Sequence, residues 1–213
     1  MFKHDKEYAF LRGAASVAGL TSTLIALPYV REKHKDQMRN DGTPYISHPL
    51  TMACHASALF SSCHQEVLGK NYLDDILTVC LLHDICEDCG VDFDSLKYND
   101  NIVEAVRLLT FSIKNDETKE QAKVRYYNEI LENETATMVK LIDRCHNVST
   151  MKTFDIKRMK KYIIETREFV LPLLEKATLR YPLVTNQLFV LKYHILSMLN
   201  IAERCVNSES NKE

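Results

Sequence analysis

The scarcity of residues that break helices limits most strongly what this chain can fold into. Only 5 Gly and 5 Pro occur among 213 residues, and apolar residues recur at helical spacing along most of the sequence. No alternating strand pattern competes with these segments. The sequence therefore predicts an all-α protein, a single bundle of roughly eight or nine helices.

The predicted helices follow one another with short breaks. Two are expected between Lys6 and Arg39, interrupted near Gly19 and Pro28. The others are expected at 48–60, 73–84, 101–110, 119–131, 135–150, 156–177 and 182–206. The segment 40–44, Asn-Asp-Gly-Thr-Pro, has the chemistry of a turn. Gly90 is expected to end or interrupt the helix that contains 73–84.

Composition and charge narrow the class of protein. With 46% hydrophobic and 26% charged residues, the chain is typical of a globular domain. The formal net charge is −2 with both signs interspersed, so we expect no nucleic-acid polymer and no membrane as a partner. No apolar run approaches the roughly 20 residues that span a bilayer, and the charged start does not resemble a signal peptide. The seven cysteines suit reduced thiols, which predicts a cytoplasmic protein.

The pair His83-Asp84 carries the strongest chemical signal. It ends an apolar run and is followed by Glu87 and Asp88, so four metal-binding or proton-handling side chains lie within six residues. On a regular helix His83 and Asp84 would project about 100° apart, and both could reach one ion only if it lay beside the helix. Other segments must then complete the site, and His48 and Asp143 are the natural candidates.

Each of these residues also has an ordinary explanation. His48 could cap a helix, His83 could be a core histidine with a hydrogen-bond partner, and Asp143 could pair with a neighbouring base. Taken together, two His and two Asp favour a divalent first-row metal with positions left open for water and substrate.

Glu87 and Asp88 follow Asp84 by three and four residues, which on a helix returns them to the side of the metal site. A carboxylate there can take a proton from an attacking water; the alternative is a solvated acidic loop. The Cys86–Cys89 pair matches Cys-x-x-Cys, but no second such pair supports a zinc or redox site. The remaining histidines lack metal-ligand neighbours and are expected at the surface or in the core: His4, His34, His55, His64 and His194.

Three segments together resemble the HD-domain metal phosphohydrolases, and more narrowly the hydrolase domain of the Rel/Spo stringent-response enzymes and the small alarmone hydrolases. They are 34–49, 82–88 and 139–147, and the likeness continues through Ile164-Glu165-Thr166 and Pro172. It covers about residues 5–178. The resemblance implies an HD hydrolase domain at 1–178, with a C-terminal helix at 179–206 packed on it and a frayed polar tail at 207–213.

The resemblance also implies a reaction and a set of residues. The substrate would be a small-molecule nucleotide, guanosine 3′-diphosphate 5′-di- or triphosphate, released as GDP or GTP plus pyrophosphate. Mn²⁺, or another divalent first-row metal, would be held by His48, His83, Asp84 and Asp143. Glu87 and Asp88 would activate the attacking water. Arg39 matches a residue that stacks on guanine, Asn147 one that contacts the nucleoside, and Thr150 a further pocket position.

Two positions depart from the family pattern. Asn40 and Ser149 stand where basic residues are common, and we expect these losses to remove positive charge near the phosphates. They leave two alternatives open: an HD enzyme acting on another nucleotide, such as an adenosine alarmone or a deoxynucleotide, and a non-catalytic nucleotide-binding regulator. Glu87 and Asp88 argue against the regulator, because simple binding gives no reason to place extra anions beside a phosphate. The segment beyond 178 has no motif and is a candidate contact in a homo-oligomer.

Overall fold

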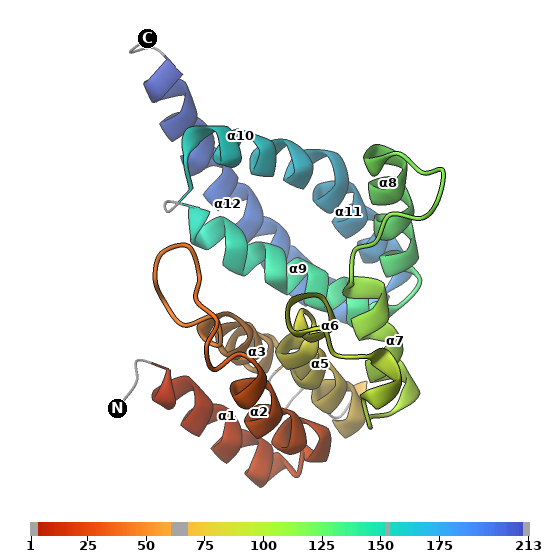
Figure 1. Cartoon of the computed structure of the whole chain (residues 1–213). Helices are drawn as coiled ribbons and strands as arrows, with labels where there is room; N and C mark the ends of the chain where they lie inside the picture. Colours follow the sequence, from red (N-terminus) through yellow and green to blue (C-terminus); the bar gives the residue numbers. More distant parts are fainter. Residues whose placement is uncertain (1–3, 61–67, 152–153, 211–213) are drawn as a thin grey trace.

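The computed structural model describes residues 4–60, 68–151 and 154–210. Within these ranges the only bridge of the kind found in sheets is an isolated antiparallel one between Met38 and Pro44, and every longer element is a helix. The predicted all-α class is confirmed (Figure 1).

The helices have well-defined bounds. The α-helices are α1 (Asp5–Ala18), α2 (Thr21–Lys33), α3 (Ser47–Leu59), α5 (Lys70–Leu82), α6 (Ile85–Cys89), α7 (Asp100–Leu109), α8 (Lys119–Leu131), α9 (Glu134–Ser149), α10 (Ile156–Glu165), α11 (Leu171–Arg180) and α12 (Thr185–Ser210). Short segments are the 3-10 turns η1 (Phe93–Ser95) and η4 (Pro182–Val184) and the π-helical η3 (Thr166–Val170). Because η3 joins α10 to α11 without a break, these form one rod; with the short α6 set aside, nine long helices remain among the described residues.

Three predicted boundaries differ from the structure. Pro28 lies inside α2 and does not interrupt it, because its neighbours Ala26, Leu27 and Val30 are fully buried and their packing outweighs the missing hydrogen bond. The helix predicted at 73–84 ends instead at Leu82, and α6 begins after a break at the residues 83–84. At the C-terminal end α12 continues through 207–210, which were expected to be frayed, whereas 211–213 lie outside the described residues.

The helix starts that the sequence predicts best carry side-chain caps. Thr118 and Gln121 form a reciprocal capping box at the start of α8, whose bounds match the predicted 119–131. Asn99, Asn133 and Asp155 accept backbone N–H bonds at the starts of α7, α9 and α10. These side chains satisfy donors that a helix cannot satisfy internally, so they fix where each helix begins.

Loss of the Thr118 cap gives a measurable change in stability. Thr118→Ala is expected to lower the free energy of unfolding by about 1 kcal/mol, because the hydroxyl that accepts from Gln121 N is removed. Thr118→Ser keeps that oxygen and is expected to stay within about 0.5 kcal/mol of the wild-type chain. Urea unfolding of the three proteins measures the difference, and equal losses in both variants would contradict the cap.

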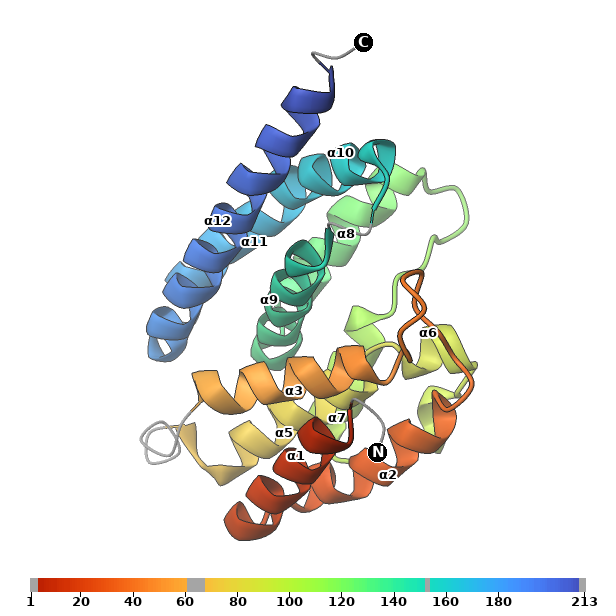
Figure 2. The same ribbon diagram turned by 90° about the vertical axis from the view of Figure 1, so that its left-hand side faces the viewer.

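The helices form two groups that meet along α5 and α9. The helices α1, α2, α3 and α5 lie together on one side, and α8 to α12 lie on the other (Figures 1 and 2). Helix α5 packs against α2, α3, α7 and α9, and α9 also contacts α8, α11 and α12. The meeting point of α3, the α5–α6 junction and α9 holds the candidate site described below.

Two further observations concern the hydropathy of the helices and the state of the cysteines. No helix of the described ranges has the length and apolar character that crossing a membrane requires. The cysteines within those ranges are free thiols, and Cys63 lies outside them.

Candidate functional site

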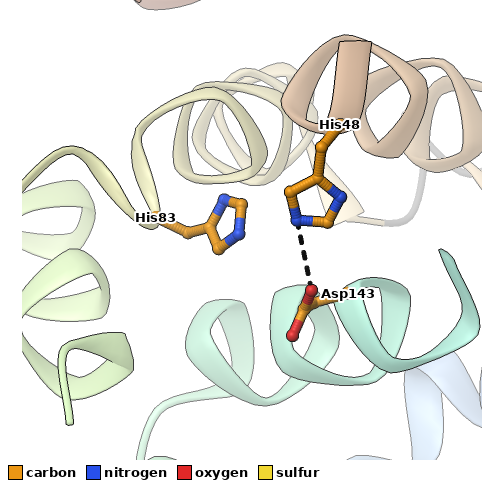
Figure 3. A group of neighbouring side chains, drawn as sticks. All are labelled: His48, His83 and Asp143. Carbon is orange, nitrogen blue, oxygen red and sulfur yellow. Dashed lines mark ion pairs between the residues drawn. The ribbon is translucent and has the colours of Figure 1, made fainter. Parts of the chain in front are cut away.

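Three buried side chains from separate helices converge at the centre of the molecule. His48 comes from the first turn of α3, His83 from the junction of α5 and α6, and Asp143 from α9 (Figure 3). Their ligand atoms all lie within 4.8 Å of one another, and each residue is less than 10% exposed. His48 Nε2 lies 3.3 Å from Asp143 Oδ1. The structure thus brings together three of the four predicted metal ligands.

The fourth, Asp84, lies directly beside this cluster. Its Oδ2 is 2.9 Å from His83 Nε2 and 3.9 Å from His48 Nε2. The side chain is 28% exposed and accepts a hydrogen bond from the Tyr45 hydroxyl. Asp84 caps α6 with φ −102° and ψ 1°, so the expectation of a regular helix through the pair is wrong. The break between α5 and α6 turns both side chains toward one point.

The orientation of His83 leaves an electron pair facing the cluster. Its Nδ1 lies 3.0 Å from the carbonyl oxygen of Cys80 and must donate there, which leaves Nε2 without a proton in the neutral ring. That buried Nε2 has no hydrogen-bond partner of acceptable geometry among the described residues, although the Asp84 carboxylate is close. Two electron-pair donors at this distance require a cation between or beside them, so the donor set fits a divalent metal.

A proton can take the place of that cation. Burial acts to lower the pKa of His83, but the charges of Asp84 and Asp143 outweigh it and raise the pKa to about 9. Burial likewise acts to raise the pKa of Asp84, and His83 outweighs it, so that pKa lies below its usual value. The negative charges of Asp84 and Asp143 therefore stabilise a positive charge on or beside the His83 ring.

His146 lies behind His48. The two Nδ1 atoms are 2.9 Å apart, so one ring donates to the other. Burial, with His48 and Arg39 nearby, lowers the pKa of His146 to about 3, which keeps its ring neutral and able to accept. A cation at His48 Nε2 requires Nδ1–H of His48 to donate to His146, an arrangement typical of a histidine held behind a metal.

Asp143 is held from both neighbouring turns of α9. Asn147 Nδ2 donates to Asp143 Oδ1 at 2.5 Å, and Lys140 Nζ lies 3.4 Å from Oδ2. Burial acts to raise the pKa of Asp143, but Lys140 and His48 lower it well below its usual value. Asn147, expected to contact a nucleoside, therefore also orients a candidate metal ligand.

A cavity of about 490 Å³ opens above the cluster. The residues that line it include Asp84, Asp143, Asn147, Arg39 and Arg158. Arg39 Nη2 donates to Thr150 Oγ1 at 3.4 Å, so Thr150, which does not border the cavity, holds Arg39 instead. Arg39 lies near the end of a tight turn at 39–43, where Arg39 N donates to Thr43 O at 2.8 Å and Gly42 has φ +76°. The predicted turn is confirmed.

The two predicted catalytic acids face different spaces. Asp88 borders the 490 Å³ cavity and accepts from Gln37 Nε2 at 2.8 Å. Glu87 borders a second cavity of about 330 Å³, which shares Asp84 with the first and is lined by Lys119, Lys123 and Lys140. Burial and the nearby Asp84 raise the pKa of Glu87. The two acids thus border neighbouring cavities that share Asp84, Lys140 and Glu165.

Comparison with known proteins gives relatives of one kind. The guanosine-3′,5′-bis(diphosphate) 3′-pyrophosphohydrolase of Aquifex aeolicus (strain VF5) is 31% identical over 153 residues, which is 70% of this chain and 20% of the relative. The bifunctional (p)ppGpp synthase/hydrolase SpoT of Escherichia coli (strain K12) is 28% identical over 151 residues, 67% of this chain and 20% of the relative. Over about two thirds of its length, this chain is similar to enzymes named for (p)ppGpp hydrolysis.

A further Rel/Spo relative extends the likeness. The guanosine-3′,5′-bis(diphosphate) 3′-pyrophosphohydrolase of Haemophilus influenzae (strain ATCC 51907 / DSM 11121 / KW20 / Rd) is 25% identical over 174 residues, 78% of this chain and 24% of the relative. No family model matches the chain. The chain spans about a fifth of the length of the curated relatives it matches.

The departures from the Rel/Spo pattern have unequal consequences in the structure. Ser149 does not border the cavity: its hydroxyl donates to Cys145 O at 2.7 Å and lies 2.7 Å from His194 Nε2. Ser149 thus lies outside the cavity lining, whereas Asn40 borders the cavity. Arg158, which sequence reasoning missed, brings a guanidinium to the wall, 4.0 Å from the ring centroid of Phe154.

Proposed function

We propose that this chain is a metal-dependent hydrolase that removes the 3′-diphosphate of guanosine 3′-diphosphate 5′-di- or triphosphate, giving GDP or GTP and pyrophosphate. The observation that carries the proposal is the largely buried cluster of two histidines and two aspartates beside a cavity that Arg39 and Arg158 help to line. The names of the Rel/Spo relatives supply the reaction.

The proposed metal ligands are His48, His83, Asp84 and Asp143. Imidazole nitrogens with carboxylate oxygens suit Mn²⁺ and other divalent first-row ions. When bound, such an ion supplies a positive charge that polarises a phosphoryl oxygen and acidifies water. His146 and Asn147 support the site by holding His48 and Asp143 in place.

The remaining roles belong to side chains of the cavities. We assign proton transfer from the attacking water to Asp88 and Glu87, which border the two cavities that Asp84 also borders. Arg39 is assigned to the face of the guanine, with Thr150 holding it, and Asn147 borders the nucleoside. Arg158 adds positive charge for the phosphates.

The decisive experiment is anion-exchange analysis of nucleotides after incubation of the purified chain with Mn²⁺ and guanosine tetraphosphate. GDP and pyrophosphate in equal amounts are expected, with none formed in EDTA. A panel of adenosine alarmones and deoxynucleotides runs alongside. Turnover confined to that panel would replace the guanosine assignment. Tight binding of guanosine tetraphosphate in saturating Mn²⁺ without product would favour the non-catalytic regulator.

Metal binding is also expected to stabilise the folded chain. Mn²⁺ at 100 times its dissociation constant is expected to raise the free energy of unfolding of EDTA-treated protein by about 2.7 kcal/mol, because the clustered ligands exist only in the folded state. Urea unfolding with and without Mn²⁺ measures the gain. His83→Ala is expected to lose most of it, and an undiminished gain in that variant would place the ion elsewhere.

Three coarser proposals accompany the reaction. We propose a hydrolase domain at 1–178 that carries the helix 179–206, and α12 does pack on α9, α10 and α11. We propose the cytoplasm as the compartment, since the described cysteines are free thiols. We also propose that the chain forms a homo-oligomer through its C-terminal segment, and light scattering of the purified chain tests this proposal.

A further inference from the structure

A buried histidine outside the metal cluster is connected to the acidic side chains of the site. His34 caps the C-terminal end of α2 and is 1% exposed. Its Nδ1 lies 2.5 Å from Gln37 Oε1, and Gln37 Nε2 donates to Asp88 Oδ2 at 2.8 Å. Two hydrogen bonds therefore lead from the core of the protein to the carboxylate of Asp88.

The direction of these bonds is fixed by chemistry. An ionised carboxylate only accepts, so Gln37 must present its NH₂ group to Asp88 and its oxygen to His34. His34 must then carry its proton on Nδ1. Burial lowers the pKa of His34, so the ring is neutral and has a single N–H. Cys89 Sγ lies 3.4 Å from the same Nδ1, and its own S–H donates to Lys33 O at 3.6 Å. Because the thiol donates to Lys33 O, the hydrogen-bond donor to Gln37 Oε1 is His34 Nδ1.

The backbone around Gln37 is held as well. Gln37 N donates to His34 O at 3.1 Å, and Tyr45 N donates to Gln37 O at 2.9 Å. The amide side chain thus starts from a fixed point. Asp88 is exposed, and without the Gln37 bond its carboxylate is free to turn toward solvent.

A second contact joins His34 to the metal cluster. The rings of His34 and Tyr45 pack with centroids 4.7 Å apart at 35°. The Tyr45 hydroxyl donates to Asp84 Oδ2, one of the proposed metal ligands. One buried ring therefore lies behind both Asp84 and Asp88.

We propose that His34 is a positioning residue for hydrolysis, which orients Asp88 through the amide of Gln37 and Asp84 through the ring of Tyr45. This inference rests on the proposed function. It departs from the expectation that His34 is an ordinary core or surface histidine, and it assigns Gln37 a role that its sequence position does not reveal.

The first test reads the protonation of the ring without any turnover. Long-range ¹H–¹⁵N correlation spectra of the ¹⁵N-labelled full chain, with His34 assigned by comparison with His34→Asn, distinguish the two neutral tautomers. The Nδ1–H form is expected in the wild-type chain. The Nε2–H form would overturn the proposal, because Gln37 would then have no donor facing its oxygen.

The second test uses kinetics. His34→Phe keeps a flat ring beside Tyr45 and removes the donor, and Gln37→Leu removes the amide. Each is expected to lower kcat about tenfold with KM changed less than about twofold. His34→Asn, whose amide nitrogen can take the place of Nδ1, is expected to recover kcat to within about threefold of wild type. His55→Phe, on the exposed face of α3, serves as the matched control and is expected to match wild type.

The third test is a double-mutant cycle, which a purely structural role would not satisfy. Because the two side chains act in series on Asp88, His34→Phe with Gln37→Leu is expected to cost no more than either change alone. Losses that multiply to about 100-fold, or full kcat in a folded His34→Phe variant, would refute the proposal. Urea unfolding checks that each variant is folded; if His34→Phe is not, Gln37→Leu decides. An inactive wild-type chain would contradict the proposed function. The tautomer of His34 would still show whether the Gln37 oxygen faces a donor, so the two failures can be told apart.

Discussion

Asp84→Asn is expected to lower kcat for pyrophosphate release by about 10³-fold and to leave the fold intact. The substitution keeps the size of the side chain and an oxygen for the Tyr45 hydroxyl. It removes the negative charge 2.9 Å from His83 Nε2 that, with Asp143, attracts a cation to the cluster. A 10³-fold loss corresponds to about 4 kcal/mol in the activation barrier, which is at the upper end of the range for removing one group that stabilises a transition state electrostatically.

Metal content and kinetics together separate two origins of that loss. If the variant binds Mn²⁺ weakly, raising the Mn²⁺ concentration restores part of the rate, and atomic emission of the dialysed protein shows less metal. If metal content is normal, the lost charge acts on the reaction itself. Asp94→Asn, an exposed aspartate of η1 outside both cavities, is the matched control and is expected to keep wild-type activity. Full activity in Asp84→Asn would remove this residue from the mechanism.

The sequence predicts the helices and the metal cluster well because each leaves a local signature. Helix α8 begins where Thr118 and Gln121 can cap each other, and this signal depends on residues only three apart. The cluster is predictable because His48, His83 and Asp143 each lie in a segment whose residue types suit a metal, although these segments are far apart in the chain. Bringing them together needs only that α3, α5 and α9 pack side by side, which a helical bundle provides.

The side-chain directions could not be predicted in the same way. Apolar periodicity indicates which face of a helix is buried, but not that α5 stops at Leu82 and turns His83 and Asp84 to one point. Ser149 faces His194 on α12, a contact between residues 45 apart in the chain. Asn147 donates to Asp143, which lies one helical turn earlier on α9. Its position in the sequence does not distinguish this role from contact with a nucleoside. Arg158 reaches the cavity from outside any motif.

The second large effect concerns stability. Arg144→Met is expected to lower the free energy of unfolding by about 3 kcal/mol, because it removes a buried ion pair and the hydrogen bonds of the guanidinium, and leaves Glu165 with Lys123 as its remaining cation. The Arg144 side chain is 2% exposed, and its Nη2 lies 2.7 Å from Glu165 Oε1. Its Nη1 donates to Thr166 Oγ1 at 3.1 Å, at the start of the π-helical η3. The guanidinium also lies 4.1 Å from the ring centroid of Tyr162. Arg144 thus ties α9 to the α10–α11 rod.

An exposed pair provides the matched control for urea unfolding. Arg180 and Glu132 have side chains 44% and 64% exposed, and Arg180→Met is expected to cost much less than Arg144→Met, because solvent screens the exposed pair. Glu165→Gln combined with Arg144→Met is expected to cost less than the sum of the two single changes, because both remove the same ion pair. Similar losses for Arg144→Met and Arg180→Met would contradict the buried network.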